Sequence, residues 1–186
     1  MAEASTILGV RLRCAREGDQ AAIATLLRAL GYSAGGGEGL TELLQAALAR
    51  PDFAIFLAFE DTEKRGAALG LMQLSRRPQL HLGGTLVSID ALAVLPSVRG
   101  RGVGKRLLRR ARAYARLHHA VRIEVHTTRA RENYQRGFYP LNGYREADSA
   151  LFRYEIRPTV VNHRQVSPDF PPPIAEQVTV DRSSIG

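Results

Sequence analysis

The sequence has one cysteine, no tryptophan and no long apolar run, and these absences exclude several classes of protein. A single cysteine, Cys14, excludes an internal disulfide framework and a cysteine-rich zinc site, and it favours a reducing compartment. No apolar run approaches the roughly 20 residues of a membrane-spanning helix. Residues 1–10 contain Glu3 and no basic segment before an apolar stretch, so we expect no secretory signal, a cytoplasmic protein and no membrane partner.

Lysine is also scarce, because Lys64 and Lys105 are the only lysines among 26 basic residues. The net charge of +8 gives a field that attracts phosphates, whether on a nucleotide-like cofactor, a nucleic acid or a lipid. The 186 residues, 45% of them hydrophobic, suffice for one domain. A chain of this size can bury enough surface to fold without a metal or a disulfide.

Hydrophobic periodicity divides the chain into strand-like and helix-like segments. The expected strands are Ile7–Arg13, Phe53–Glu60, Ala67–Leu74, Leu82–Val94, Val121–Val125 and Leu151–Ile156. The expected helices are Ala21–Leu30, Thr41–Ala49, Val103–His118 and Arg129–Tyr139. The pattern predicts an α/β (α+β) fold in which helices flank one mixed sheet, in the order strand, two helices, three strands, helix, strand, helix and closing strands.

We expect one domain over residues 1–157 and a proline-rich tail over residues 158–186. In the tail, Pro158, Pro168 and the run Pro171–Pro173 lie among polar residues without helical or strand periodicity. Two interpretations stay open: a disordered tail, or a strand packed on a partner subunit, which would make the protein a homodimer.

The segment Leu92–Lys105 carries the strongest chemical signal. A strand ends, a glycine-rich turn follows, and an apolar-faced helix begins; the glycines are Gly100, Gly102 and Gly104. The first N–H groups of a helix lack intrahelical partners and carry about half a positive charge, and glycines leave them accessible. Mobile positive charge is added by Arg99, Arg101 and Lys105. The turn therefore predicts a phosphate or pyrophosphate site.

Spacing excludes two other nucleotide-binding motifs. A P-loop needs Ser or Thr after Gly-Lys, but Arg106 follows Gly104-Lys105, so no hydroxyl is placed for Mg²⁺. A dinucleotide fingerprint has the spacing G-x-G-x-x-G near the first strand, whereas these glycines have the spacing G-x-G-x-G midway along the chain.

A second block completes a resemblance to a known family. Phe138-Tyr139-Pro140-Leu141-Asn142-Gly143-Tyr144 resembles the F-Y-x-x-x-G-F signature of the GNAT N-acetyltransferase superfamily. Arg99-x-x-Gly102-x-Gly104, preceded by Leu92-Ala93-Val94 and Pro96, is similar to that family's acyl-CoA pyrophosphate loop. The resemblance extends from the first strand to about Ile156. It implies a mostly antiparallel sheet, acetyl-CoA as co-substrate, and direct acetyl transfer to a primary amine of a small molecule or peptide in a ternary complex.

The resemblance also implies roles for particular residues. The CoA pyrophosphate would be held by main-chain N–H groups of Arg99, Gly100, Arg101, Gly102, Val103 and Gly104. The backbone of Leu92 would hydrogen-bond the thioester carbonyl, and that of Val94 would pair with the pantetheine arm. Tyr139 would protonate the departing thiolate, and Asn133 would contact the pantetheine or an ordered water.

Asp90 is the candidate general base. An acceptor amine must be neutral to react, and a lysine-like ammonium has a pKa of about 10.4, so the site must accept a proton. Strict alternation would place Asp90 on the same strand face as Ser88 and Leu92. Two alternatives stay open: Asp90 pairs with an arginine, or it binds the acceptor's ammonium without taking its proton. Glu124 and His126 on the next strand could also reach the cleft through water.

The remaining polar residues give weaker signals. No ligand spacing accompanies His118 and His119, so we expect no metal site, and we expect Cys14 to be a small core residue. Solvation is the expected environment of Arg109, Arg112 and Arg116, which share one outer helix face. A basic helix also suits nucleic acid, but no aromatic residues interleave with these arginines, so a nucleic-acid partner is less favoured.

Two functions outside catalysis stay open: a CoA-binding regulatory module, and a nucleic-acid-binding protein on the same fold. Acceptor specificity is expected to depend on Tyr32–Leu40, between the first two helices, on the strand hairpins and on the tail. These segments carry few acidic residues, so a polycationic acceptor is not specially favoured. A small amine, an amino acid and a protein N-terminus all stay open as acceptors, and so does another acyl donor on the same fold.

Overall fold

The computed structural model describes residues 9–32, 39–61, 66–152 and 154. Within these residues, five strands form one sheet in the order β1-β2-β3-β4-β5. The strands are β1 (Val10–Cys14), β2 (Phe53–Glu60), β3 (Ala68–Gln79), β4 (Gly84–Val94) and β5 (Ala120–Val125). The helices are α1 (Gln20–Ala29), α2 (Leu40–Leu48), α3 (Val103–Leu117) and α4 (Glu132–Gln135). All belong to the first of the two units into which the chain divides, residues 1–146.

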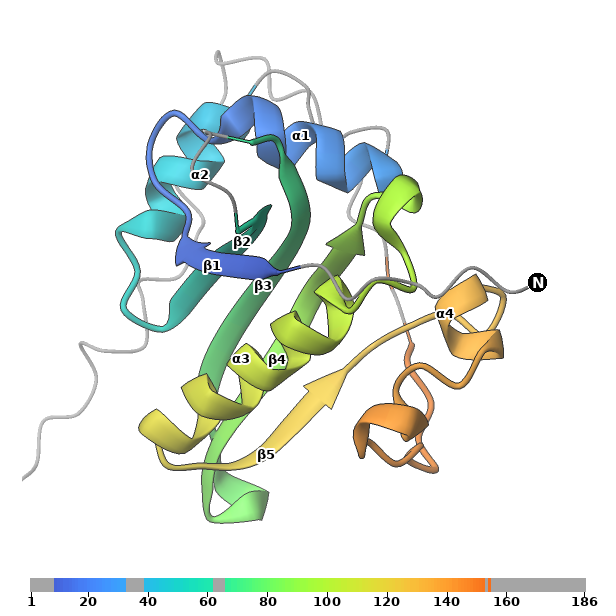
Figure 1. Cartoon of the computed structure of the whole chain (residues 1–186). Helices are drawn as coiled ribbons and strands as arrows, with labels where there is room; N and C mark the ends of the chain where they lie inside the picture. Colours follow the sequence, from blue (N-terminus) through green and yellow to red (C-terminus); the bar gives the residue numbers. More distant parts are fainter. Residues whose placement is uncertain (1–8, 33–38, 62–65, 153, 155–186) are drawn as a thin grey trace, which may run out of the picture. The chain divides into compact units, whose positions relative to one another are not determined.

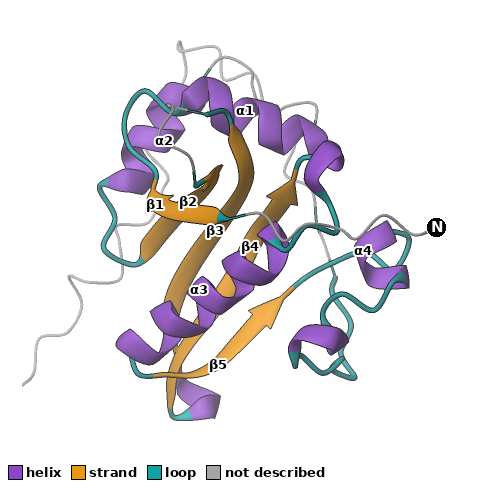
Figure 2. Cartoon of the chain, viewed as in Figure 1, coloured by secondary structure: helices purple, strands orange, loops and turns teal. Residues whose placement is uncertain are grey.

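The sheet is antiparallel from β1 to β4, and β5 joins it in parallel. Parallel strands need a crossover connection, and α3 supplies it between β4 and β5. Pairing of β4 with β5 runs from Thr85↔Ala120 to Ile89↔Val125 and then stops, although β4 continues to Val94. The two strands run apart toward their carboxyl ends (Figures 1 and 2). Residues 91–94 of β4 therefore have a strand partner on the β3 side alone among the described residues.

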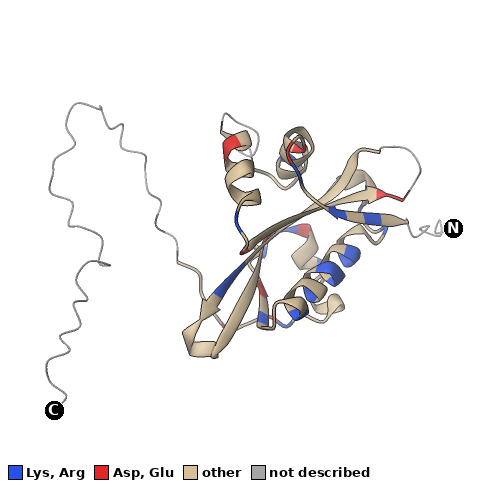
Figure 3. Cartoon of the chain, turned by 90° about the vertical axis from the view of Figure 1, so that its left-hand side faces the viewer, with Lys and Arg blue, Asp and Glu red and all other residues tan. Residues whose placement is uncertain are grey.

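Helices cover both faces of the sheet, with α1 and α2 on one face and α3 on the other (Figure 3). The apolar stripe predicted on α3 is buried as expected, at Val103, Leu107, Leu108, Ala111 and Ala115. Each fully buried leucine contributes roughly 1.5–3 kcal/mol to folding. Gly70 of β3 gives α3 room, since a Cβ there would lie 3.0 Å from Val103 Cγ1 and 3.2 Å from Leu107 Cδ1. The predicted fold class is confirmed.

Two predicted elements differ in length. β3 continues beyond Leu74 through a polar stretch, because Arg76, Arg77 and Pro78 pair with the first half of β4. The helix expected over Arg129–Tyr139 shrinks to the four residues of α4. Gly137 ends it with a φ of +64°, a left-handed conformation that favours glycine.

Three expectations concern the chain's ends. Cys14 is exposed at the end of the edge strand β1, so the expectation of a core cysteine is wrong. Of the strand expected over Leu151–Ile156, the described residues Leu151, Phe152 and Tyr154 are not in a strand, and the rest lie outside the described residues. The tail over residues 158–186 also lies outside them. No helix among the described residues is long and apolar enough to cross a membrane.

Asp19 joins β1 to the start of α1. Its carboxylate accepts two hydrogen bonds from the Arg13 guanidinium, at 2.7 and 2.8 Å, and one from the Arg16 N–H at 2.8 Å. The hydrogen bonds from Arg13 hold the pKa of Asp19 below its usual range, against the opposing effect of burial. A carboxylate with a depressed folded-state pKa stabilises the fold above the unfolded-state pKa, and this stabilisation disappears as pH falls through the folded-state value.

Asp19→Asn is therefore expected to lower the free energy of unfolding at pH 7 by roughly 1–2 kcal/mol, since Arg13 is partly solvated. The difference from wild type should begin to shrink as the pH falls below about 4, where the carboxylate takes up a proton in the unfolded chain, and it should be lost once the pH is below the lower folded-state pKa. Urea titrations at several pH values measure this difference. If the loss in free energy of unfolding stayed the same at acidic pH, the charge of Asp19 would not be its cause.

Candidate active site

β4 contains a β-bulge at Asp90. Neighbouring residues Gln73 and Leu74 of β3 pair with Ala91 and Ile89, which leaves Asp90 without a partner on β3. An extra residue of this kind interrupts the alternation of side chains along a strand. The two halves of β4 are therefore out of phase with each other.

The bulge overturns one expectation about faces. Val87 and Ile89, before the bulge, and Leu92, after it, all pack in the core beneath α3. Ser88 alternates with its two neighbours and so lies on the opposite face from Leu92. The expectation that Asp90 shares a face with both Ser88 and Leu92 is wrong, because a register shift separates the two.

Beyond the bulge, the backbone of β4 offers unpaired groups at its open edge. The N–H of Leu95 donates to the carbonyl of Leu69 on β3 at 3.0 Å. Because main-chain groups alternate in direction along an antiparallel strand, those of Leu92 and Val94 point away from β3. The main chain at Leu92 and Val94 therefore faces the space where β4 and β5 separate.

Arg99 supports this orientation and is itself held in place. Its Nε donates to the Val94 carbonyl at 3.3 Å, and its guanidinium pairs with Glu132 of α4 at 3.1 Å. The carbonyl of Val94 thus has a partner, whereas its N–H has none on the open side among the described residues. Arg99 was expected to add mobile charge, but it links the end of β4 to α4 instead.

The turn before α3 presents main-chain N–H groups. After a short 3₁₀ helix, η2 (Pro96–Val98), Gly100 and Gly102 adopt φ values of +79° and +88°. The hydrogen bonds of the described residues give no acceptor to the N–H groups of Gly100, Gly102, Val103 and Gly104. The first intrahelical bond runs from the Arg106 N–H to the Gly102 carbonyl at 3.0 Å. These groups, at the positive end of a 15-residue helix, form a site suited to an anion.

Gly104 joins the two sequence motifs to each other. A Cβ at Gly104 would lie 2.9 Å from Cζ and 3.2 Å from Cε2 of the Phe138 ring. The missing side chain therefore makes room for Phe138, whereas the sequence suggested room for a phosphate. A side chain at position 104 is excluded by Phe138, which lies far along the chain, and the spacing of the glycines alone does not reveal this contact.

Tyr139 is the buried polar residue of this region, with 8% of its surface exposed. Burial raises the pKa of its phenol, while the charge of Arg131 and hydrogen bonds from Asn133 and Thr127 oppose this rise. Asn133 Nδ2 donates to the Tyr139 oxygen at 3.5 Å, and Asn133 Oδ1 accepts from the Tyr134 N–H at 2.9 Å. The phenol therefore keeps its proton throughout the neutral range, and Asn133 makes a long contact with its oxygen.

Aromatic rings and one arginine fix the loop that carries Tyr139. Its ring makes edge-to-face contacts with Phe138 and Tyr144, with centroids 5.2 and 6.1 Å apart. Arg112 on α3 donates to the Asn142 carbonyl at 2.9 Å, in the 3₁₀ helix η3 (Pro140–Asn142). Arg112 was expected on a solvated face, but it is half-buried and ties this loop to α3. Other basic residues of α3 do line its outer face (Figure 3).

The candidate bases differ in their surroundings. Asp90 is exposed, and no arginine pairs with it among the described residues. Glu124 is paired with Arg122 on its own strand at 3.3 Å, and His126 is exposed. No cluster of metal-ligating side chains occurs in the part of the chain that the structure describes.

A sheet that opens between two parallel strands, beside a turn of unpaired N–H groups and a buried phenol, is consistent with the acyltransferases that the two motifs resemble. The model of the acetyltransferase (GNAT) family matches residues 21–144, about two thirds of the chain. The chain belongs to this family. Among curated proteins, none matches the sequence.

Solved structures share the fold at low sequence identity. A Trypanosoma brucei acetyltransferase is 22% identical with a TM-score of 0.65, covering 78% of this chain and 99% of its own. An aminoglycoside acetyltransferase from an uncultured soil metagenomic sample, in complex with sisomicin, is 18% identical with a TM-score of 0.68, covering 80% and 97%. AAC(6')-Iy, in complex with the bisubstrate analogue CoA-S-monomethyl-acetylneamine, is 19% identical with a TM-score of 0.64, covering 80% and 99%.

Proposed function

We propose that this chain transfers an acetyl group from acetyl-CoA to a primary amine, by direct attack in a ternary complex. The observation that carries the proposal is the open backbone edge of β4 at Leu92 and Val94, which leads into a turn of unpaired N–H groups. An extended chain ending in a pyrophosphate matches these two features in order, because it can pair with the edge and place its charge at the helix start.

The residues present fit acetyl-CoA. The unpaired N–H groups of Gly100, Gly102, Val103 and Gly104 would bind the pyrophosphate, whereas those of Arg99 and Arg101, also expected to bind it, already donate to the Pro96 and Val98 carbonyls at 3.3 and 3.4 Å. The N–H of Val94 would pair with the pantetheine arm. The N–H of Leu92 would donate to the thioester oxygen and stabilise the negative charge that develops there. Asn133, assigned to the pantetheine by resemblance, would act on the reaction through Tyr139, since it already contacts the Tyr139 oxygen.

The transfer itself needs little from the protein besides position and proton movement. The neutral amine nitrogen forms a bond to the acetyl carbon, and the carbon–sulfur bond breaks. Tyr139 gives its proton to the departing sulfur, and the amine's proton passes to Asp90 or to water. Asp90 suits this role because it is exposed at the bulge, two residues before Leu92, and it lacks an arginine partner among the described residues.

Calorimetric titration tests the donor assignment. Acetyl-CoA is expected to bind with micromolar affinity, whereas ATP and a short oligonucleotide give no heat. Release of free thiol from acetyl-CoA should then depend on added amine. If acetyl-CoA gives no heat and the oligonucleotide binds with an affinity that falls as salt is added, the chain would be a nucleic-acid-binding protein. Acetyl-CoA binding without transfer to any amine would indicate a regulatory CoA-binding module.

A further inference from the structure

Arg131 lies between β5 and α4, beside the proposed reaction centre. The Tyr134 and Gln135 N–H groups of α4 donate to its carbonyl at 3.0 and 3.1 Å, so its backbone is fixed. Its guanidinium carbon lies 5.8 Å from the ring centroid of Tyr32, which follows α1. The side chain is half-buried. Arg131 therefore connects the segment expected to set acceptor specificity with the loop around Tyr139.

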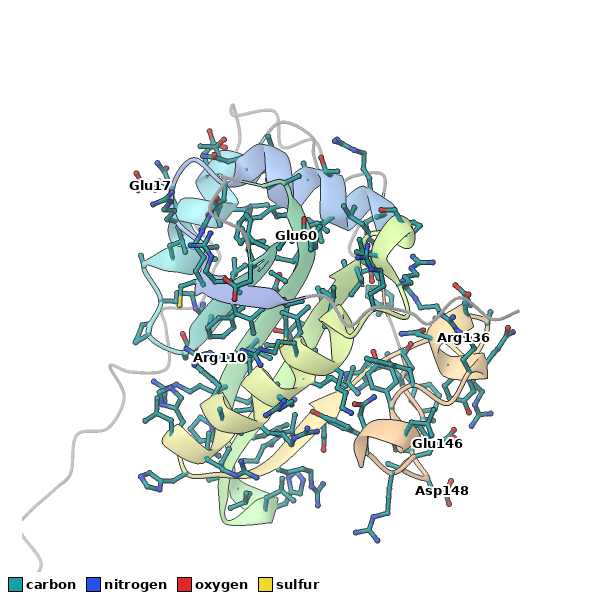
Figure 4. All side chains as sticks on the ribbon, in the orientation of Figure 1. Glu17, Glu60, Arg110, Arg136, Glu146 and Asp148 are labelled. Carbon is teal, nitrogen blue, oxygen red and sulfur yellow. The ribbon has the colours of Figure 1, made fainter. Side chains whose placement is uncertain are left out.

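The charge of Arg131 has no anionic partner among the described residues. Its two neighbouring arginines both have one: Arg129 pairs with Glu146 at 2.9 Å, and Arg136 pairs with Glu132 at 3.3 Å. Arg136 and Glu146 are labelled in Figure 4. A contact with an aromatic face compensates a half-buried guanidinium less than a two-point hydrogen bond with a carboxylate. The five N–H donors of Arg131 are thus available to an anion from outside the chain.

The position of this charge relates it to the acceptor. Arg131 is close enough to Tyr139 for its charge to oppose the effect of burial on the pKa of the phenol. Tyr139 faces the sulfur in the proposed transfer, and the attacked carbon is bonded to that sulfur. In an α-amino acid, the carboxylate carbon is two bonds from the amine nitrogen. Arg131 also contacts Tyr32, in the segment expected to set acceptor specificity, so the anion that it would meet belongs to the acceptor.

We propose that Arg131 selects acceptors that carry a carboxylate next to the amine, such as α-amino acids, by bidentate pairing with that carboxylate. This inference rests on the proposed function and names the class of its acceptor. Pairing of this kind is directional and holds the neighbouring nitrogen in one orientation. The same charge repels additional ammonium groups, so a polycationic amine is expected to be a poor acceptor.

The test compares α-amino acids with their carboxamides as acceptors of the full-length protein. Rates are expressed per neutral amine, because the carboxylate raises the pKa of the neighbouring ammonium. Wild type is expected to prefer the carboxylate form by at least about 10-fold in kcat/KM. Arg131→Gln should remove this preference by lowering kcat/KM for the carboxylate form alone, and it should leave the KM for acetyl-CoA unchanged. Arg131→Lys, which keeps the charge but loses the planar fork, should retain part of it.

Arg109→Gln is the matched control, since Arg109 is an exposed arginine of α3 whose side chain makes no hydrogen bond or ion pair among the described residues. It should leave the preference intact. Equal loss for both acceptor forms in Arg131→Gln would overturn the inference and assign Arg131 to acetyl-CoA or the leaving thiolate. Equal use of carboxylates and carboxamides by wild type would also overturn it, while the proposed function stands. Failure to bind acetyl-CoA would instead overturn the proposed function.

Discussion

Gly102→Val is expected to abolish acetyl-CoA binding while the chain keeps its fold. Gly102 has a φ of +88° and directly precedes α3, so its conformation directs the N–H groups that follow. A β-branched residue at positive φ is strained by roughly 1–3 kcal/mol and relaxes by rotating the peptide. Rotation would turn the N–H groups of the turn away from a common point, and each lost charge-assisted hydrogen bond weakens pyrophosphate binding. Calorimetry should detect no binding of acetyl-CoA.

Gly18→Val separates lost binding from lost stability. Gly18 has a φ of +93°, and a Cβ there would meet nothing within 4 Å, so the same substitution introduces similar strain in the loop before α1. Both variants should lose similar amounts of thermal stability, but Gly18→Val should bind acetyl-CoA normally. Normal binding by Gly102→Val would show that the pyrophosphate loop is misplaced. Equal loss in both variants would attribute the effect to folding.

The sequence predicts most of the fold because the informative patterns are local. The period of α3, the two apolar runs of β2 and β3, and the glycine-rich turn can each be recognised within a window of a few residues. Gly137 also indicates locally that the helix after β5 cannot continue as far as Tyr139. The extension of β3 over Arg76–Pro78 is different, because that polar stretch becomes a strand only through pairing with β4.

The details of the candidate site depend on contacts between distant segments. The bulge at Asp90 arises because β4 has one residue more than the β3 segment that it pairs with, so neither strand's own pattern reveals it. Gly104 is small because of Phe138, and Arg112 is half-buried because its hydrogen bond to the Asn142 carbonyl holds it against η3. Arg131 gave no signal in the sequence, since its position beside Tyr32 and Tyr139 depends on segments that are far apart along the chain. Position in a motif predicts candidate residues for the site, but it does not predict what each of them contacts.

Tyr139→Phe is expected to lower kcat by about 100-fold, at the lower end of the range for loss of a general acid, because a thiolate leaves with little help. The KM for acetyl-CoA should change by less than about two-fold, since phenylalanine keeps the ring contacts with Phe138 and Tyr144. Burial raises the pKa of Tyr139 above its ordinary value of 10.0, so the acid is protonated at neutral pH. In wild type, the alkaline decline of kcat should begin as the pH rises through this elevated pKa, and the variant should lack that decline.

Tyr144→Phe is the matched control for this substitution. The Tyr144 oxygen is buried without a well-formed hydrogen bond within the described residues. Burial raises the pKa of its phenol and nearby Arg112 opposes this rise, but Arg112 takes no part in the proposed reaction. Thermal stability should stay equal or rise slightly, because a buried unsatisfied hydroxyl costs about 1–3 kcal/mol. Steady-state kinetics and single-turnover rates of both variants distinguish an effect on the transfer step from an effect on binding or product release. A parallel loss of acetyl-CoA affinity in Tyr139→Phe would make Tyr139 a binding residue, and an unchanged kcat would assign the leaving-group proton to water.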